Sequence, residues 1–168
     1  MGATRASESP KHQTTVERKS ERERVVTRTF DAPARLVFDA WTKPELMKRW
    51  WVPRSIPMSL VSCEMDVRTG GTYKLTFKME PHPPMDFFGR YVEVVPNRRL
   101  VWTNEESGAD ASTTTVTFEE KDGMTTVVVS ELYPSKEALE ADGAHEAAKE
   151  VHAQLDALLA ALRADGVA

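Results

Sequence analysis

The sequence predicts a single α+β domain in which an antiparallel sheet of six to seven strands wraps around one long C-terminal helix. Three observations carry this prediction. Apolar and polar residues alternate along several short segments. Turn-forming sequences separate these segments, and one long apolar stripe with helical spacing lies near the C-terminus.

Length and composition are typical of one globular domain. The chain has 168 residues, of which 40% are hydrophobic and 29% charged, and this is enough to bury one core. The net charge of -4 predicts no attraction to nucleic acid. The single cysteine excludes an internal disulfide and fits a reducing compartment, so we expect a cytoplasmic protein. No segment is apolar enough for a signal peptide or a membrane span, so no membrane partner is expected.

The N-terminal segment divides into a tail and the start of the domain. Residues 1–20 are predicted to be a flexible polar tail, because they show no apolar periodicity. The domain is expected over residues 21–165, beginning with a strand that ends near Phe30. Asp31 then fits a helix cap, and Pro33 fits the first helical turn.

Two short helices are expected after the first strand. The first has an apolar stripe that includes Trp41, and Pro44 begins a second helix, predicted over residues 45–50. The segment from Trp50 to Pro57 combines prolines with large aromatic residues. We therefore expect a loop that packs on the core and borders a pocket.

Six further strands are expected after this loop, over residues 58–66, 71–79, 87–95, 98–104, 112–119 and 124–132. The turn signals between them are short, so neighbouring strands should pair as antiparallel hairpins. Tyr73, Leu75 and Phe77 alternate with polar residues, which predicts one buried face and one exposed face.

One long helix, from about Ser135 to Arg163, is expected to cover the buried face. Alanines occupy the N-terminal half of its apolar stripe and leucines the C-terminal half. The helix should therefore pack tightly near Leu158 and leave space near Ala144 and Ala148. We expect a ligand cavity there.

The predicted cavity is lined by apolar, aromatic and a few polar side chains. The candidates are Trp41, Trp50, Trp51, Tyr73, Leu75, Phe77, Trp102, Asn104, Val127, Val129, Glu131, Ala144, Ala148, Val151 and Leu155. Aromatic residues of this kind also fill ordinary cores, so that alternative stays open.

Glu131 is the one weak catalytic candidate. Its strand position could point inward, where a raised pKa would suit a general base. Solvent exposure or a structural hydrogen bond is the interpretation we favour. His145 and His152 are expected on the surface of the final helix, with Asp156 as a partner for His152, because their spacing is too wide for a helical metal site.

No metal or cofactor is expected. His82 lies in a proline-rich connection without acidic or cysteine neighbours. Cys63 is expected to be a small core residue, because no feature that activates a thiolate lies near it in the sequence.

Six motifs and the order of elements resemble a known family. The motifs are Phe30-Asp-Ala-Pro33, Val37-Phe38-Asp-Ala-Trp41-Thr-Lys-Pro-Glu45, Trp50-Trp51-Val-Pro53, Asp66-Val-Arg68-Thr-Gly70-Gly71, Gly89-Arg-Tyr91 and Val95-Pro96-Asn-Arg-Arg-Leu100-Val. They resemble proteins identified as homologues of the activator of the Hsp-ninety ATPase, within the START-like (SRPBCC) superfamily. The resemblance implies a helix-grip fold with a cavity.

The start of the final helix departs from the family pattern. Many relatives have a Gly-Met and then a Gly-Trp pair there, whereas this chain has alanines at 144, 147 and 148. Loss of such bulk changes the cavity, so the ligand of a relative cannot be transferred to this chain.

Three functions follow from these observations. The leading hypothesis is a non-enzymatic protein that binds a small apolar molecule in its cavity. The second is a cavity enzyme of cyclase or hydrolase type that uses Glu131 with Asn104 or Tyr73. The third is a chaperone-associated interaction domain, as the name of the family suggests. The sequence leaves a homodimer open.

Overall fold

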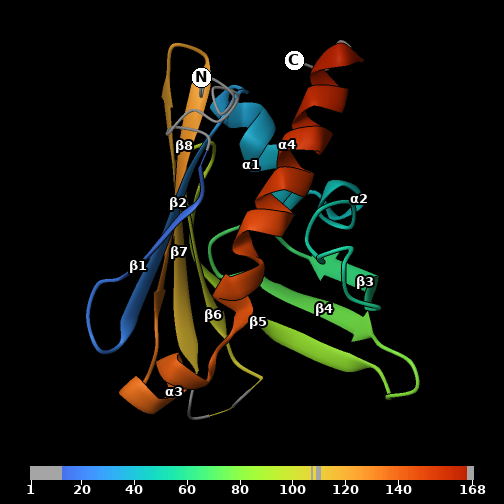
Figure 1. The fold of residues 1–168 in the computed structure, drawn as a ribbon, viewed down its shortest axis with the longest axis vertical. Coiled ribbons are helices and arrows are strands. Elements are labelled where there is room, and N and C mark those ends of the chain that lie inside the picture. Colours follow the sequence, from blue (N-terminus) through green and yellow to red (C-terminus); the bar gives the residue numbers. More distant parts are fainter. Residues whose placement is uncertain (1–12, 107, 109–110, 166–168) are drawn as a thin grey trace, which may run out of the picture.

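The computed structural model describes residues 13–106, 108 and 111–165 (Figure 1). The strands are β1 (Thr15–Arg18), β2 (Glu23–Phe30), β3 (Ser59–Met65), β4 (Thr72–Lys78), β5 (Met85–Val95), β6 (Arg99–Asn104), β7 (Ser112–Lys121) and β8 (Met124–Leu132). The helices are α1 (Ala34–Thr42), α2 (Pro44–Met47), α3 (Lys136–Ala141), the 3-10 helix η4 (Ala144–Ala147) and α4 (Ala148–Ala164).

All eight strands form one antiparallel sheet in the order β1-β2-β8-β7-β6-β5-β4-β3. From β3 to β8, each strand pairs with the next strand in the sequence. On the other side of β8 lies β2, and β1 forms the edge of the sheet beside β2. The sheet is strongly curved, and α4 runs across its concave side (Figure 1). The predicted α+β helix-grip architecture is therefore confirmed, with one strand more than the upper end of the expected range.

The additional strand is β1, which corrects the prediction of a flexible tail over residues 1–20. Residues 15–18 pair with β2 in the register Thr15 to Thr27 and Arg18 to Arg24. All four residues of β1 are exposed, so backbone hydrogen bonds hold it without an apolar face. A sequence pattern based on burial could not detect such a strand. The rest of the predicted tail, residues 1–12, lies outside the described residues.

The predicted C-terminal helix is broken at Asp142 and Gly143. Ser135 caps α3 by accepting a hydrogen bond from the Ala138 backbone N–H at 3.1 Å. Asp142 then has an extended backbone, with φ of -84° and ψ of 113°, and α4 begins only at residue 148. The prediction of one continuous helix from Ser135 to Arg163 is therefore wrong.

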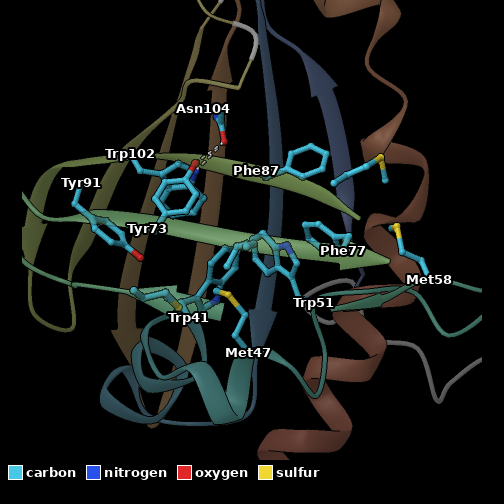
Figure 2. Close-up of a pocket in the computed structure, with 13 residues that line it drawn as sticks. Trp41, Met47, Trp51, Met58, Tyr73, Phe77, Phe87, Tyr91, Trp102 and Asn104 are labelled. Carbon is cyan, nitrogen blue, oxygen red and sulfur yellow. Dashed lines mark hydrogen bonds between the residues drawn. The ribbon is translucent and has the colours of Figure 1, made fainter. Parts of the chain in front are cut away.

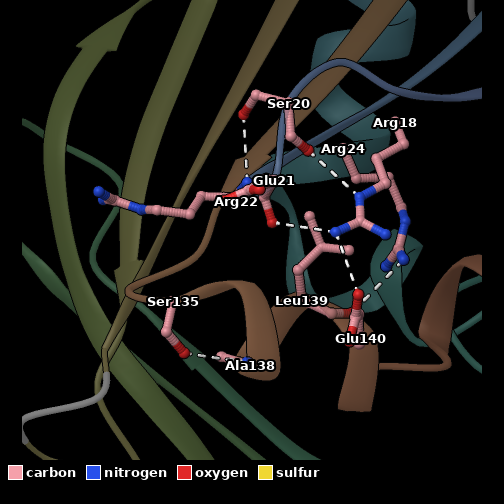
Figure 3. Close-up of polar contacts among 9 residues, drawn as sticks. All are labelled: Arg18, Ser20, Glu21, Arg22, Arg24, Ser135, Ala138, Leu139 and Glu140. Atoms are coloured by element: carbon pink, nitrogen blue, oxygen red, sulfur yellow. Dashed lines mark hydrogen bonds and ion pairs between the residues drawn. The ribbon is translucent and has the colours of Figure 1, made fainter.

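Arginines on β1 and β2 contact the C-terminal end of α3, just before the break (Figure 3). Arg24 is buried, and its guanidinium donates to the carbonyl oxygens of Asp142 at 3.2 Å and Leu139 at 3.4 Å. The carbonyl groups at the end of a helix have no N–H partner in a following turn. Here the Arg24 side chain supplies the donor that they lack. Arg18 adds a more exposed ion pair with Glu140 at 3.3 Å.

The leucine half of the α4 stripe packs as predicted. Leu155, Leu158, Leu159 and Leu162 are all buried in the main core. They share this core with Phe30 of β2 and with the apolar side of α1. Within the described residues, no helix combines the length and the apolar character needed to cross a bilayer.

Replacement of Leu155 by alanine tests how much of the stability depends on α4. Leu155 is 0% exposed, so Leu155→Ala should lower the free energy of unfolding by about 2–5 kcal/mol. Leu132 is 45% exposed, and Leu132→Ala should cost less than about 1 kcal/mol. Urea unfolding of both variants measures the difference, and equal losses would contradict the described packing of α4.

Candidate functional site

A pocket of about 270 Å³ lies between one half of the sheet and the segment that runs from α1 to β3 (Figure 2). Its floor comes from β3, β4, β5 and β6, and its roof from α1, α2 and the loop after α2. The lining residues are Trp41, Met47, Trp51, Met58, Met65, Tyr73, Leu75, Phe77, Met85, Phe87, Tyr91, Trp102 and Asn104. None of them carries a charge.

Strand alternation directs the floor residues toward the pocket. Leu75 of β4 pairs with Phe87 of β5, and Phe77 pairs with Met85, so these four side chains share the concave face. Gly89 has a special role in this arrangement, because a Cβ atom there would lie 1.9 Å from the Thr103 carbonyl oxygen. Only glycine lets β5 approach β6 so closely.

The aromatic roof is centred on Trp41, which is 4% exposed. Its ring lies 4.8 Å from Trp50, 5.5 Å from Trp51 and 6.3 Å from Trp102, measured between centroids. Trp50 lies behind this group, and its indole N–H donates to the Ala40 carbonyl at 3.0 Å. The tryptophans therefore hold one another in place through edge contacts.

Gln154 of α4 holds the loop that carries Trp51. This side chain is 7% exposed. Its amide nitrogen donates to the carbonyls of Trp50 at 3.0 Å and Val52 at 2.9 Å, and its oxygen accepts from the Arg54 N–H at 2.8 Å. Although α4 supplies no lining residue, it fixes one wall of the pocket through this amide.

Asn104 provides the polar end of the pocket, and its amide is fully hydrogen bonded. Its oxygen accepts from the Tyr73 hydroxyl and from the Trp102 indole N–H, each at 3.2 Å. Its nitrogen donates to Ser112 and Thr114, each at 3.0 Å. Burial raises the pKa of Tyr73, so its hydroxyl stays protonated.

With this geometry in view, the comparison with known proteins identifies the family. Residues 31–160 match the sequence pattern of the family described as activator of Hsp90 ATPase homolog 1-like protein. The chain belongs to this family. The resemblance seen in the sequence motifs is thereby confirmed. No curated protein matches the sequence significantly.

Three solved structures of this family's fold resemble the chain. A protein from Nitrosomonas europaea is 24% identical with a TM-score of 0.77, and the match covers 88% of this chain and 99% of that one. One from Rhodobacter sphaeroides is 20% identical with a TM-score of 0.81, covering 89% and 100%. One from Mycobacterium smegmatis is 26% identical with a TM-score of 0.73, covering 88% and 98%.

The pocket contains part of the predicted lining set. The predicted residues found there are Trp41, Trp51, Tyr73, Leu75, Phe77, Trp102 and Asn104. The predicted residues that do not line it are Trp50, Val127, Val129, Glu131, Ala148, Val151 and Leu155. The side chain of Ala144 lies outside the described residues.

The pocket is not located beside Ala148, where the alanine-rich half of the helix predicted a cavity. The chain is extended at Asp142, and α4 begins only at Ala148. Arg24 and Tyr133 are both buried next to the break, with the Arg24 guanidinium 5.9 Å from the centre of the Tyr133 ring. Both side chains contact the break at Asp142, so this region is filled by protein groups.

Glu131 belongs to a hydrogen-bonded cluster outside the pocket. Its carboxylate accepts from the Tyr133 hydroxyl at 2.9 Å and from the Thr114 hydroxyl at 3.4 Å. The Tyr133 hydroxyl also contacts a carboxylate oxygen of Asp142. Burial raises the pKa of Glu131, and the neighbouring Asp142 charge adds to this. The carboxyl ties β8 to β7 and to the helix break.

The structure also shows where the other titratable candidates from the sequence lie. His152 is 5% exposed, which corrects its predicted surface position, and Asp156 pairs with Arg28. The side chain of His145 lies outside the described residues. Burial raises the pKa of Cys63, whose thiol contacts the Met65 sulfur at 3.2 Å. In the described part of the chain, no group of three histidine, cysteine or carboxylate side chains could hold a metal ion.

Several lining residues were missed by the sequence reasoning. They are Met47, Met58, Met65, Met85, Phe87 and Tyr91. Continuation of the strand alternation from β4 into β5 could have found Met85 and Phe87. Gln154 had no comparable signal, because one glutamine in an amphipathic helix is normally a surface residue.

The buried imidazole of His152 generates a pH prediction. Its Nδ1 lies 3.0 Å from the Thr14 hydroxyl, and burial with the nearby Arg28 charge lowers its pKa to about 4 from 6.5. The unfolded chain therefore takes up a proton at higher pH than the folded chain does. This histidine should lower the free energy of unfolding by about 2 kcal/mol as pH falls from 7 to 5.

The comparison that isolates this effect is the wild type against His152→Gln, with urea unfolding at several pH values. Other titrating groups are common to both proteins. The extra loss between pH 7 and 5 should be absent in the variant. Parallel pH profiles would show that His152 titrates normally in the fold.

Gln154→Met tests the anchoring of the loop that carries Trp51. Methionine keeps the volume but removes three hydrogen bonds, which should lower the free energy of unfolding by about 2–4 kcal/mol. Lys149→Met, at an exposed position of the same helix, should change it by less than about 0.5 kcal/mol. Similar unfolding curves for the two variants would show that the amide is dispensable.

Proposed function

We propose that this protein binds a small, largely apolar molecule in the pocket beneath Trp41. The observation that carries the proposal is the combination of an open volume of about 270 Å³ with a lining that contains no charged side chain. Ligand pockets usually combine an apolar wall with a few placed polar groups, and Asn104 with the two tyrosines supplies these.

The size of the pocket limits the ligand. Its volume lies just below the range of about 300–1,000 Å³ that is usual for drug-sized ligands, so a molecule of about two fused rings suits it better than a long lipid. Four methionines in the lining, Met47, Met58, Met65 and Met85, add adaptable, polarisable surface that packs well on aromatic rings.

The enzymatic alternative has less support. It needs an acid or base inside the cavity, and among the described residues the lining includes no aspartate, glutamate or histidine. Glu131, its strongest candidate, is instead hydrogen bonded to Tyr133 and Thr114. The chaperone-associated alternative rests on the description of the family.

Binding can be tested with naphthalene as the probe and a plugged pocket as the control. At ten times its dissociation constant, a ligand stabilises the fold by about 1.4 kcal/mol, which should raise the melting temperature by about 3–5 °C. Met58→Trp, in the pocket lining, should abolish this shift by filling the pocket.

The matched variant is Val61→Trp, since Val61 is 52% exposed and does not line the pocket. It should keep the full shift with naphthalene. A wild-type protein that no apolar compound stabilises at its solubility limit would refute the binding function. So would equal shifts for Met58→Trp and the wild type.

A further inference from the structure

We propose that the ligand is a neutral aromatic molecule with a carbonyl-type oxygen, and that the Tyr91 hydroxyl donates a hydrogen bond to this oxygen. The inference rests on the proposed binding function and specifies the class of ligand. It follows from the hydrogen-bonding groups that the pocket leaves unused.

Tyr91 is the central observation. Its side chain lines the pocket and is 4% exposed. Its hydroxyl has no hydrogen-bond partner among the described residues, and it points from β5 toward the Trp41 side of the pocket (Figure 2). Burial raises the pKa of Tyr91, so the hydroxyl keeps its proton and is available as a donor.

The other polar groups at this end of the pocket are already engaged. Tyr73 donates its proton to the Thr103 carbonyl at 2.7 Å, with Asn104 at 3.2 Å. The Trp102 indole N–H also bonds Asn104, and both amide hydrogens of Asn104 are donated to β7. These groups therefore shape the pocket without needing a ligand.

Trp41 is a second donor without a partner. Its indole nitrogen is buried and bonds no group among the described residues, and an indole nitrogen can only donate. Trp41 and Tyr91 flank the same Trp102 ring, with centroid distances of 6.3 Å and 6.5 Å. Buried donors without partners are rare. The Trp41 nitrogen is closed off from the pocket surface, so of these two donors the Tyr91 hydroxyl is the one that a ligand oxygen can reach.

The lining also determines the charge and shape of the ligand. Among the described residues it contains no lysine, arginine or histidine, so a carboxylate would lose its hydration without an opposite charge in return. Trp41, Trp51, Trp102 and Phe77 present ring faces and edges to the cavity, and these favour a flat aromatic body. A neutral aromatic ketone satisfies all of these constraints.

The test compares three probes of nearly equal shape, by calorimetry on the full-length protein. 2-Acetylnaphthalene has the carbonyl, 2-ethylnaphthalene replaces it with a methylene group, and 2-naphthoate carries a negative charge. The wild type should bind the ketone about three- to tenfold more tightly than the hydrocarbon, since one hydrogen bond has about this effect. The carboxylate should bind more weakly than either.

Tyr91→Phe removes only the hydroxyl and should abolish the preference for the ketone, because the carbonyl oxygen would then be buried without a donor, while binding of the hydrocarbon stays within about twofold of the wild type. Tyr133→Phe is the matched control, because Tyr133 lies outside the pocket lining, and it should keep the preference. If Tyr91→Phe does not fold, the infrared carbonyl stretch of the ketone bound to the wild type provides the test. Hydrogen bonding should lower this frequency relative to the ketone in hexane.

The outcomes separate this inference from the proposed function. Binding of neither neutral probe would refute the binding function itself. Equal binding of ketone and hydrocarbon by the wild type, or a preference that survives in Tyr91→Phe, would overturn the inference while binding stands. An unshifted carbonyl stretch, or a carboxylate that binds as tightly as the ketone, would also overturn it.

Discussion

The structure depends on the fact that α4 covers only one half of a concave sheet. Its leucines pack beside β2 and α1, and no residue of α4 reaches the pocket over β3 to β6. A curved sheet has more inner surface than one amphipathic helix can cover. The remaining surface is covered by the loop after α2, which stays in place because Gln154 on α4 bonds its backbone.

Side-chain contacts link the walls of the pocket to one another. The tryptophans of the roof contact one another edge to face, and Asn104 links β6 to β7 through two side-chain bonds. Protein interiors normally close to high density, and an empty space forfeits the packing of its lining. A small molecule that fills this space would restore those contacts, which supports the ligand-binding function proposed above.

The sequence could predict the features that depend on local patterns. The alternation in β4 and the leucine stripe of α4 record which faces are buried, so the strands from β3 to β8, the pairing of neighbours among them and the packing of Leu155 and Leu158 were predictable. The pairing of β1 was not, because it is exposed and held by backbone bonds. The burial of His152 follows from the same segment, since Thr14 contacts its ring.

The position of the pocket depended on contacts between residues far apart in the chain. Arg24 bonds carbonyls at the break after α3, and nothing in the local sequence around Ala144 records this. Gln154 likewise acts on a loop about a hundred positions away. Seven predicted lining residues were found in the pocket because they lie on strands or next to short helices, where local patterns determine direction.

The most direct test of the account is methionine-methyl NMR of the wild type during titration with naphthalene. Met47, Met58, Met65 and Met85 line the pocket, whereas Met124 lies at the start of β8, outside the lining. The account predicts saturable shifts in the signals of the four lining methionines and none in that of Met124. Unchanged signals of these four methionines, or equal shifts at Met124, would contradict it.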